Sequence, residues 1–298
     1  FEPGGILAGK VDGPALYVLL GLFAFGTGKA ALMPFHRWLP AAMVAPAPVS
    51  ALLHAVAVVK AGVFTILKLL VYLFGLDYLG ETGASVWLMY VAGATVLAAS
   101  LVAMTKDNLK ARLAYSTVSQ LSYIVLGAAL AAPLAVVGGA MHIVMHAFGK
   151  ITLFFCAGAI DVALHKTEVR DMRGIGRQMP FTMSAFLVGA LCVIGLPPLG
   201  GLWSKWYLFL GALEADQLVF VAVLMVSSLL NIAYLLPIPV RAFFSRPEGE
   251  EEGAGLREAP LPCVAALVVT ALGCVLLFFQ AGPIYRFLAP LAPGLAGD

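Results

Sequence analysis

The sequence predicts an all-α membrane protein with about eight transmembrane helices, two of them broken. Of its 298 residues, 61% are apolar and only 11% are charged, whereas soluble domains average roughly 45–50% and 25%. The apolar residues form runs of about 20 or more, which is enough to cross a hydrocarbon core about 30 Å thick. Glycine and proline interrupt two of these runs beside a lysine. An ordinary soluble globule is therefore excluded.

The expected spans are separated by clusters of charged residues. Their approximate limits are 14–33, 49–74, 85–104, 113–132, 134–164, 180–213, 217–240 and 261–281. Alternate loops carry eleven Lys and Arg on one side and two on the other. The positive-inside rule places the richer loops in the cytoplasm and both termini outside. The chain opens at Phe1 with no initiator Met and no signal-peptide pattern, so we expect a processed chain or a fragment.

The first interrupted span surrounds Lys29. Gly26, Gly28 and Pro34 bracket this lysine. Proline removes a backbone donor and breaks the helical ladder. In lipid the released carbonyls must find partners in protein or water, so a break at membrane depth indicates a cavity or a channel wall.

The second interrupted span, in the stretch VIGLPPLGGLWSKWYLF, leads into Lys205. Its break residues are Gly195, Pro197, Pro198, Gly200 and Gly201. Paired interrupted helices are the best pointer in a sequence to the ion path of a transporter. Glycine and proline are common in membrane helices in general. For either break alone, the alternative therefore stays open that its glycines and prolines have no transport role.

Histidine and lysine form a polar stripe on the fifth span. His142, His146 and Lys150 follow at i, i+4 and i+8, which places them within a wedge of about 80° on an ideal helix. Imidazole titrates near neutrality and a desolvated lysine releases its proton more readily, so the stripe suits a proton relay. The alternative is that these three side chains only form hydrogen bonds that hold neighbouring helices together.

Further polar groups lie on the neighbouring spans. His54 and Lys60 are six residues apart on the second span and do not share a face. An ionisable group at the centre of a membrane helix costs about 2.5–3.5 kcal/mol on insertion scales, so buried lysines call for a functional reason. Lys68, near a span end, can extend to the interface instead. The start of the fourth span is rich in polar residues that hold either waters or neighbouring helices: Ser116, Thr117, Ser119, Gln120, Ser122 and Tyr123.

Other function classes find little support in the sequence. The net charge of +2 is spread along the chain, so no basic stripe is available for nucleic acid. The four cysteines form no CxxC pair, and no haem, flavin or iron–sulfur motif is present, so we expect no cofactor in this chain. Residues 241–260 include an acidic stretch with glycines, which predicts a solvated linker. The expected topology places this linker in the cytoplasm, and we assign it no function.

Four stretches together resemble one family. They are GKAALMPFHRWLPAAMVAPAPVSALLHAVAVVKAGVF, DNLKARLAYSTVSQLSYIVLG, HIVMHAFGKITLFFCAG and GLPPLGGLWSKWYL. In this order they resemble the antiporter-like membrane subunits of respiratory complex I (NADH:quinone oxidoreductase), membrane-bound hydrogenases and multisubunit sodium/proton antiporters. PAPVSALLHAVAVVKAG resembles the largest antiporter and complex I subunits (L, M or N type), whereas VRDMRGIGRQMP and WSKWYLF favour the antiporter D subunit.

The resemblance implies a fold of fourteen helices with two inverted five-helix repeats, of which this chain corresponds to the last eight. Residues 1–84 would end the first repeat, and residues 85–240 would form the second, with its broken helix at 180–213. Residues 241–260 would be the linker, and 261–298 the closing helix and tail. The family pairs the lysine of the first broken helix with a glutamate on an earlier helix, and no expected span here contains a glutamate.

The resemblance also implies roles for the lysines and histidines. Lys29 and Lys205 would be the broken-helix lysines, and Lys60 the central lysine between the two halves. His142, His146 and Lys150 would link them, and His54 matches a histidine of some members. The implied function is a proton-translocating subunit, with or without sodium exchange, of a larger membrane assembly in a bacterial or archaeal cell membrane. Any redox chemistry would belong to a partner subunit.

Two alternatives stay open at this point. One is a non-conducting scaffold that only packs against partner subunits. The other is a free-standing carrier of an organic solute, which would need a roomy pocket at the membrane midplane.

Overall fold

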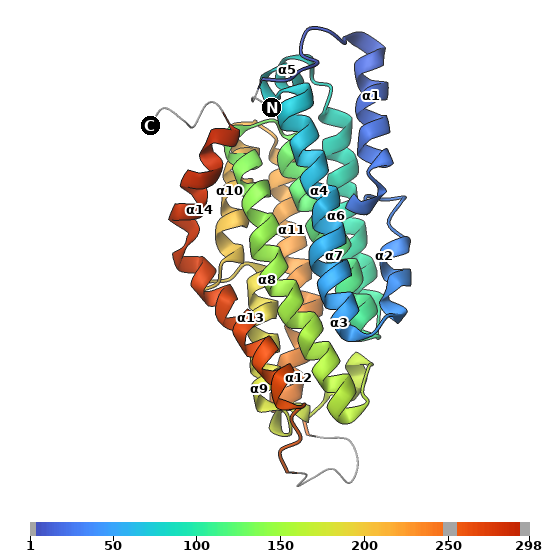
Figure 1. Ribbon diagram of the computed structural model, residues 1–298, viewed down its shortest axis with the longest axis vertical. Coiled ribbons are helices and arrows are strands. Elements are labelled where there is room, and N and C mark those ends of the chain that lie inside the picture. The colour runs from blue at the N-terminus through green and yellow to red at the C-terminus, as the bar shows by residue number, and fades with distance from the viewer. Residues whose placement is uncertain (1–3, 247–254, 293–298) are drawn as a thin grey trace.

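The computed structural model is all-α and describes residues 4–246 and 255–292. Most of its helices run along the long axis of the molecule (Figure 1). In chain order the α-helices of the described residues are α1 (Gly13–Gly26), α2 (Trp38–Ala41), α3 (Ala47–Val49), α4 (Val58–Lys68), α5 (Leu76–Thr82), α6 (Val86–Thr105), α7 (Leu109–Ala129), α8 (Pro133–Leu164), α9 (Pro180–Ile194), α10 (Gly201–Glu214), α11 (Leu218–Leu235), α12 (Pro237–Phe244), α13 (Leu261–Phe279) and α14 (Ala281–Leu288).

Each of the expected spans is largely helical, but the helices differ in continuity. In the described part of the chain, α6, α8, the stretch Leu218–Phe244 and α13 are each long and apolar enough to cross a membrane. A fifth candidate joins Val58–Phe74 to α5 with a bend of 79°. Helix α7 is of similar length but contains Lys110, Arg112 and a run of hydroxyl residues. Helices α1 and α9 are shorter because the predicted breaks end them.

The segment around Lys60 departs from regular α-helix. A π-helical segment, η3 (Ser50–Ala57), precedes α4, and a second one, η4 (Leu69–Phe74), follows it. π-helical turns use i→i+5 hydrogen bonds and occur frequently at functional sites. His54 lies in η3, and its side chain is outside the described residues. No local pattern predicts the π-helical turns, since the apolar length alone predicts a continuous helix.

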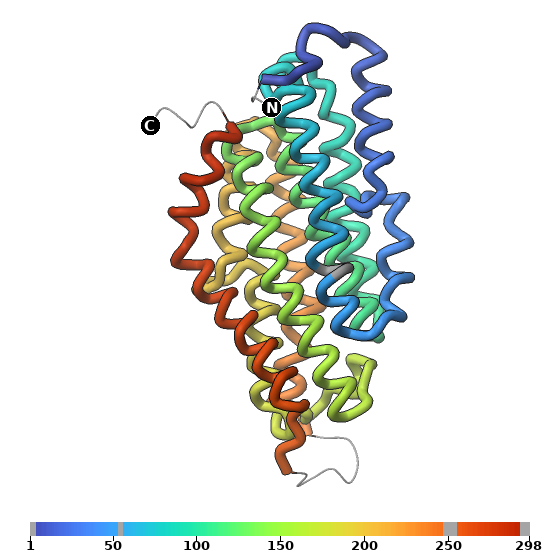
Figure 2. Tube along the Cα trace, in the orientation of Figure 1, coloured from blue at the N-terminus to red at the C-terminus, as the bar shows by residue number. Residues whose placement is uncertain are grey.

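Helix α4 passes directly against the first break, as the chain trace in Figure 2 shows. A Cβ atom on Gly62 would lie 2.5 Å from the backbone nitrogen of Ala30 and from the carbonyl carbon of Lys29. Only glycine therefore allows the two backbones to approach this closely.

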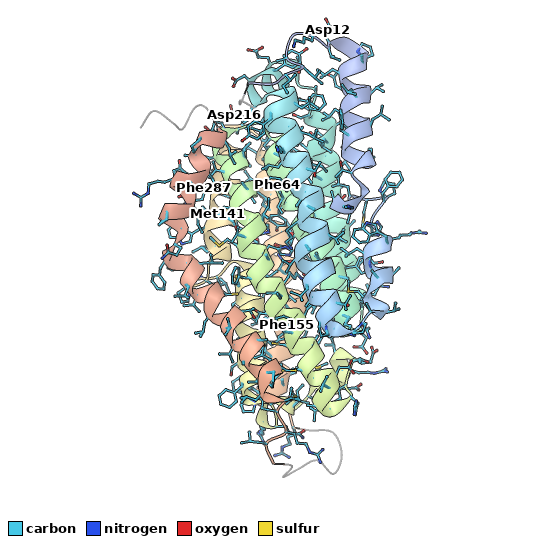
Figure 3. The ribbon with its side chains drawn as sticks, viewed as in Figure 1. Asp12, Phe64, Met141, Phe155, Asp216 and Phe287 are labelled. Carbon is cyan, nitrogen blue, oxygen red and sulfur yellow. The ribbon has the colours of Figure 1, made fainter. Side chains whose placement is uncertain are left out.

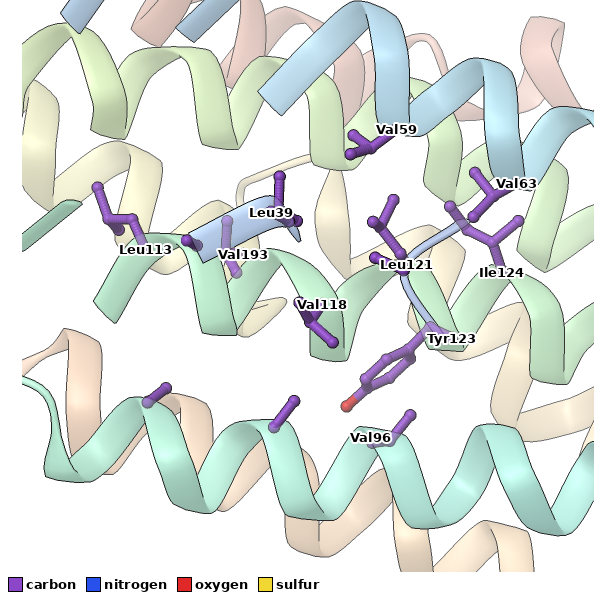
Figure 4. Packing of buried hydrophobic residues seen from close by; sticks show 14 of the residues in the cluster. Leu39, Val59, Val63, Val96, Leu113, Val118, Leu121, Tyr123, Ile124 and Val193 are labelled. Carbon is purple, nitrogen blue, oxygen red and sulfur yellow. The ribbon is translucent and has the colours of Figure 1, made fainter. Parts of the chain in front are cut away.

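The core lies between α4, α6, α7, α8 and α9. Figure 4 shows the side chains of Val96, Val118, Leu121 and Tyr123 packed between neighbouring helices. Nearly every residue of α7 from Leu113 onward is buried. The polar residues predicted at the start of this span are thus inside the molecule.

Apolar side chains cover the flanks of the molecule, and charged ones gather toward its ends. In Figure 3 Asp12 and Asp216 lie near one end, whereas Phe64 and Phe287 lie along the side. The phenylalanines are 52% and 81% exposed. A belt of exposed apolar side chains is expected where lipid, rather than water, surrounds the protein.

Helix α13 crosses the molecule diagonally over α8 and α9 (Figure 1). Two hydrogen bonds join it to the second break. The backbone N–H of Gly200 donates to the carbonyl of Cys274 at 3.0 Å, and the indole N–H of Trp203 donates to the carbonyl of Phe278 at 3.0 Å.

The predicted acidic linker lies partly outside the described residues, which omit 247–254. Its end is not merely solvated. The Glu258 carboxylate accepts bonds from the backbone N–H groups of Phe181 (2.7 Å) and Thr182 (3.2 Å), and from the Thr182 hydroxyl (2.6 Å). A carboxylate at a helix N-terminus satisfies unpaired donors and complements the helix dipole, so Glu258 caps α9.

Candidate functional site: a lysine and histidine row inside the helices

The second break places a lysine at the end of a half-helix. Helix α9 ends at Ile194, Gly195 takes φ +91°, and α10 begins at Gly201. The Lys205 ammonium donates to the carbonyl of Ile194 at 3.0 Å. A cation is stabilised at a helix C-terminus, where carbonyl groups lack partners. The carbonyl released by the break is thus satisfied by the lysine that follows it.

The backbone packing at this break is very close. A Cβ atom on Gly201 would lie 1.9 Å from the carbonyl oxygen of Cys192. The other predicted break residues, Pro197, Pro198 and Gly200, form the connecting turn. Glycine at position 201 therefore sets how near α10 starts to the end of α9.

The first break has a different environment. Helix α1 ends at Gly26, a short 3-10 turn covers Gly28–Ala30, and the Trp38 indole N–H donates to the carbonyl of Gly28 at 3.0 Å. Pro34 follows in a turn. The Lys29 side chain is exposed, whereas Lys60, Lys150, His142 and His146 are buried.

A buried row begins where α4 meets α8. The Lys60 ammonium lies 2.9 Å from Nδ1 of His146. The imidazoles of His146 and His142 stack at 5.5 Å between centroids with 15° between their planes. All three side chains are at most 7% exposed. Residues separated by 86 positions in the sequence thus form a direct polar contact within the helix bundle.

The row continues from His142 to α7 and α10. Nδ1 of His142 lies 2.8 Å from the Ser204 hydroxyl, and Nε2 lies 3.1 Å from the side-chain oxygen Oε1 of Gln120. The Tyr123 ring stacks on His142 at 5.6 Å. The Lys205 ammonium sits 5.1 Å from the centroid of the same tyrosine ring, a cation–π contact. The row thus runs from Lys60 to His146 and His142, and the Tyr123 ring lies between His142 and Lys205.

Lys150 is buried but turns away from this row. Its ammonium donates to the Ser116 hydroxyl at 2.5 Å and to the carbonyl of Leu113 at 3.2 Å, both on α7. The i, i+4, i+8 spacing predicts the same side of α8 for Lys150 and the two histidines. Its ammonium bonds to α7, and Lys60 from α4 provides the ammonium group next to His146.

A second polar layer connects α6, α7 and α11. The Ser100 hydroxyl lies 2.9 Å from that of Ser119 and 3.4 Å from that of Ser227. Farther along α11 the Tyr234 hydroxyl bonds to the side-chain oxygen of Asn231. The Arg112 guanidinium donates to the carbonyl of Tyr234 at 3.1 Å. Buried hydroxyl groups therefore extend from the neighbourhood of the row toward Arg112 at the start of α7.

Three buried atoms near the row have no hydrogen-bond partner among the described residues. They are Nε2 of His146, the side-chain nitrogen of Gln120 and the hydroxyl of Tyr123. Buried polar atoms are almost always hydrogen-bonded, and exceptions often mark function. In the described residues no group of three His, Cys, Asp or Glu side chains is placed to hold a metal ion.

With this geometry in place, comparison with known proteins identifies the family. Residues 8–231 match the family described as NADH:quinone oxidoreductase/Mrp antiporter, TM. The chain belongs to this family. It is 38% identical over 260 residues to NADH-quinone oxidoreductase subunit N of Desulforudis audaxviator (strain MP104C), covering 86% of this chain and 51% of that protein.

Relatives come from both branches of the family. The chain is 37% identical over 242 residues to the A/B subunit of a probable K(+)/H(+) antiporter of Rhizobium meliloti (strain 1021), covering 78% of this chain and 23% of that protein. It therefore spans about half, or less, of the length of these curated relatives. The expectation of an antiporter-like membrane protein is confirmed, and relatives from both branches leave its place between complex I and antiporters open.

Solved structures show the same fold. A chain of the Mrp complex from Dietzia sp. DQ12-45-1b superposes with a TM-score of 0.85 at 24% identity, over 97% of this chain and 61% of that one. A chain of respiratory complex I from Thermus thermophilus with bound NADH gives 0.79 at 23% identity, over 96% and 60%.

Proposed function

We propose that this chain moves protons, with or without exchange for Na⁺, along the row from Lys60 through His146 and His142 to Lys205. The observation that carries the proposal is the 2.9 Å contact between Lys60 and His146 inside the helix bundle. A lysine and an imidazole at this distance share a proton, and the second imidazole extends the path toward α10. Packing alone does not require three such groups in a row.

The chemistry follows from how each group is held. Lysine is a poor carrier while its ammonium is well solvated, and it releases a proton when it is desolvated or approached by another cation. Imidazole carries a proton on either nitrogen, so a ring can accept at one nitrogen and donate from the other. The two rings stack without a hydrogen bond between them, so the transfer from His146 to His142 requires a bridging water. The bond from Lys205 to Ile194 gives the far end a resting position from which its ammonium can be displaced.

The broken helix connects this chemistry to conformation. Ser204 and Lys205 both lie on the first turn and a half of α10, so a small movement of α10 against α9 changes two contacts together. These are the hydroxyl contact to His142 and the carbonyl contact at Ile194. Half-helix ends of this kind stabilise ions in transporters.

The wider setting is part of the same proposal. Residues 85–240 form the second of two inverted repeats, residues 1–84 end the first, and 261–298 form the closing helix and tail. The whole protein works beside other membrane subunits of an antiporter or complex I-like assembly in a bacterial or archaeal cell membrane. In such an assembly Lys29 acts in the first half and His54 near Lys60.

The test uses the full-length protein in its complex, reconstituted in sealed vesicles. Proton pumping or cation/proton exchange is measured for Lys205→Ala and Lys60→Ala, with Lys10→Ala, an exposed loop lysine, as the control. Loss of transport in both variants that still assemble supports the row. Retained transport in both contradicts the proposal and favours the scaffold alternative.

A further inference from the structure

A cavity of about 350 Å³ lies beside Lys205, between the second break and α11. Its walls are apolar, formed by Leu196, Trp206, Phe209, Leu224, Met225 and Leu229. Ligand pockets commonly span about 300–1,000 Å³ and combine apolar walls with a few convergent polar groups. This cavity is at the small end of that range.

The cavity opens on the flank of the molecule rather than at its ends. The side chains of Trp206, Met225 and Leu229 at its walls are 50%, 57% and 65% exposed. In a membrane-spanning chain such a flank faces the hydrocarbon region. A ligand would therefore enter sideways from the bilayer, and it must have an apolar tail.

The inner end of the cavity presents hydrogen-bond donors. The Lys205 ammonium lies there, 3.5 Å from the Ser228 hydroxyl. The Tyr123 side chain lines the same space, whereas its hydroxyl is buried away from it. This hydroxyl lies near Ser227, Ser228 and Asn231, but makes no hydrogen bond of good geometry among the described residues.

Within residues 4–246 and 255–292 no carboxylate is recorded in contact with this lysine. Among the described residues the recorded partners of the Lys205 ammonium are the Ile194 carbonyl, the Ser228 hydroxyl and the Tyr123 ring, and no ion pair is formed. An ammonium beside a hydroxyl group and without an anion is complementary to a carboxylate, which accepts several bonds. A cationic head group would face the lysine charge at close range.

We propose that this cavity binds a single-chain carboxylate of the fatty-acid type, with its head group on Lys205 and Ser228 and its tail between α10 and α11. A single acyl chain suits the limited volume of the cavity, whereas the two chains of a diacyl lipid do not. Binding stands on the cavity itself. Its consequence, inhibition by holding Lys205 away from the row, rests on the proposed function.

Photolabelling tests the site without measuring transport. The full-length protein in its complex is placed in phosphatidylcholine vesicles and labelled with decanoic acid carrying a terminal diazirine. Labelled peptides are mapped by mass spectrometry. We expect labels on α10 and α11 near Trp206 and Leu229, displaced by decanoate but not by equal concentrations of decanol or decylammonium.

Variants separate a built site from ordinary lipid contact. Lys205→Met should reduce labelling about tenfold, because a charge-assisted pair is lost, whereas Lys10→Met should leave it unchanged. Leu229→Trp should block labelling by filling the cavity, and Leu272→Trp, on the exposed face of α13, should not. The tryptophan pair keeps the test decisive if the lysine variant fails to assemble.

Equal displacement by decanol, or undiminished labelling in assembled Lys205→Met or Leu229→Trp, would overturn the proposal. Carboxylate-selective labelling of a complex that does not transport would support the site while contradicting the proposed function. Selective labelling together with decanoate-sensitive transport would support both.

Discussion

Replacing Gly201 by alanine should separate the two halves of the second broken helix. The added Cβ would lie 1.9 Å from the carbonyl oxygen of Cys192 and 3.0 Å from its carbonyl carbon. Contact between carbon and oxygen is relaxed at about 3.4 Å, so the start of α10 must move by about 1.5 Å. The obstacle is backbone at the end of α9, which no rotamer change can clear. Over-packing of this kind costs about 1–3 kcal/mol.

The displacement reaches the row one turn later. Ser204 is three residues from Gly201, and its hydroxyl lies 2.8 Å from His142. A shift of that size takes the pair beyond hydrogen-bonding distance. Losing one buried hydrogen bond, about 0.5–1.5 kcal/mol, corresponds to roughly two- to tenfold slower translocation.

The assay combines thermal unfolding of the full-length complex with proton transport in vesicles. Gly282→Ala in α14 is the matched control, because a Cβ there meets nothing within 4 Å. We expect a lower midpoint and slower transport for Gly201→Ala only. Wild-type stability together with wild-type transport in this variant would refute the argument from close packing.

Three further substitutions test single contacts. Glu258→Ala should lower the unfolding free energy by about 0.5–2 kcal/mol, because α9 loses its N-terminal cap. Chemical denaturation measures this loss, with Glu81→Ala at an exposed position as the control. Equal stability of the two variants would contradict the capping role of Glu258. Ser204→Ala should slow proton transport about two- to tenfold without preventing assembly, and an unchanged rate would remove the serine from the path. Gly211→Val should prevent assembly, because even a Cβ at this position would lie 2.1 Å from a backbone nitrogen of α8. Gly80→Ala should assemble normally, because a Cβ there meets no atom within 4 Å. Normal assembly of the valine variant would contradict the close packing of α8 and α10.

The sequence predicts the helices of this fold well because each depends on local properties. Apolar length locates α6, α8 and α13, and the glycines and prolines around Lys205 mark the end of α9 and the start of α10. The spacing of His142 and His146 likewise predicts their stacking, since i and i+4 share a helix face.

The sequence does not predict which side chains meet between different helices. That Lys60 joins His146, or that Ser204 joins His142, depends on how distant segments pack, and no local period encodes it. Gln120 and Tyr123 are visible in the sequence only as members of a polar run, and a serine next to Lys205 carries no signal of its own. The direction of Lys150 depends on the length of its side chain, which helical geometry does not fix.

The two hydrogen bonds from the second break to α13 make bilayer thickness relevant to this protein. Helix α13 has 19 residues, about 28 Å of helix, and it lies diagonally over its neighbours (Figure 1). A thicker membrane favours a more upright helix and a thinner one a more tilted helix. Because Cys274 and Phe278 accept bonds from Gly200 and Trp203, a change in tilt pulls on the turn that holds Lys205 in place. Transport should therefore pass through an optimum as the acyl chains of the vesicle lipids are lengthened, and the optimum should flatten in Trp203→Phe, which lacks one of the two connections.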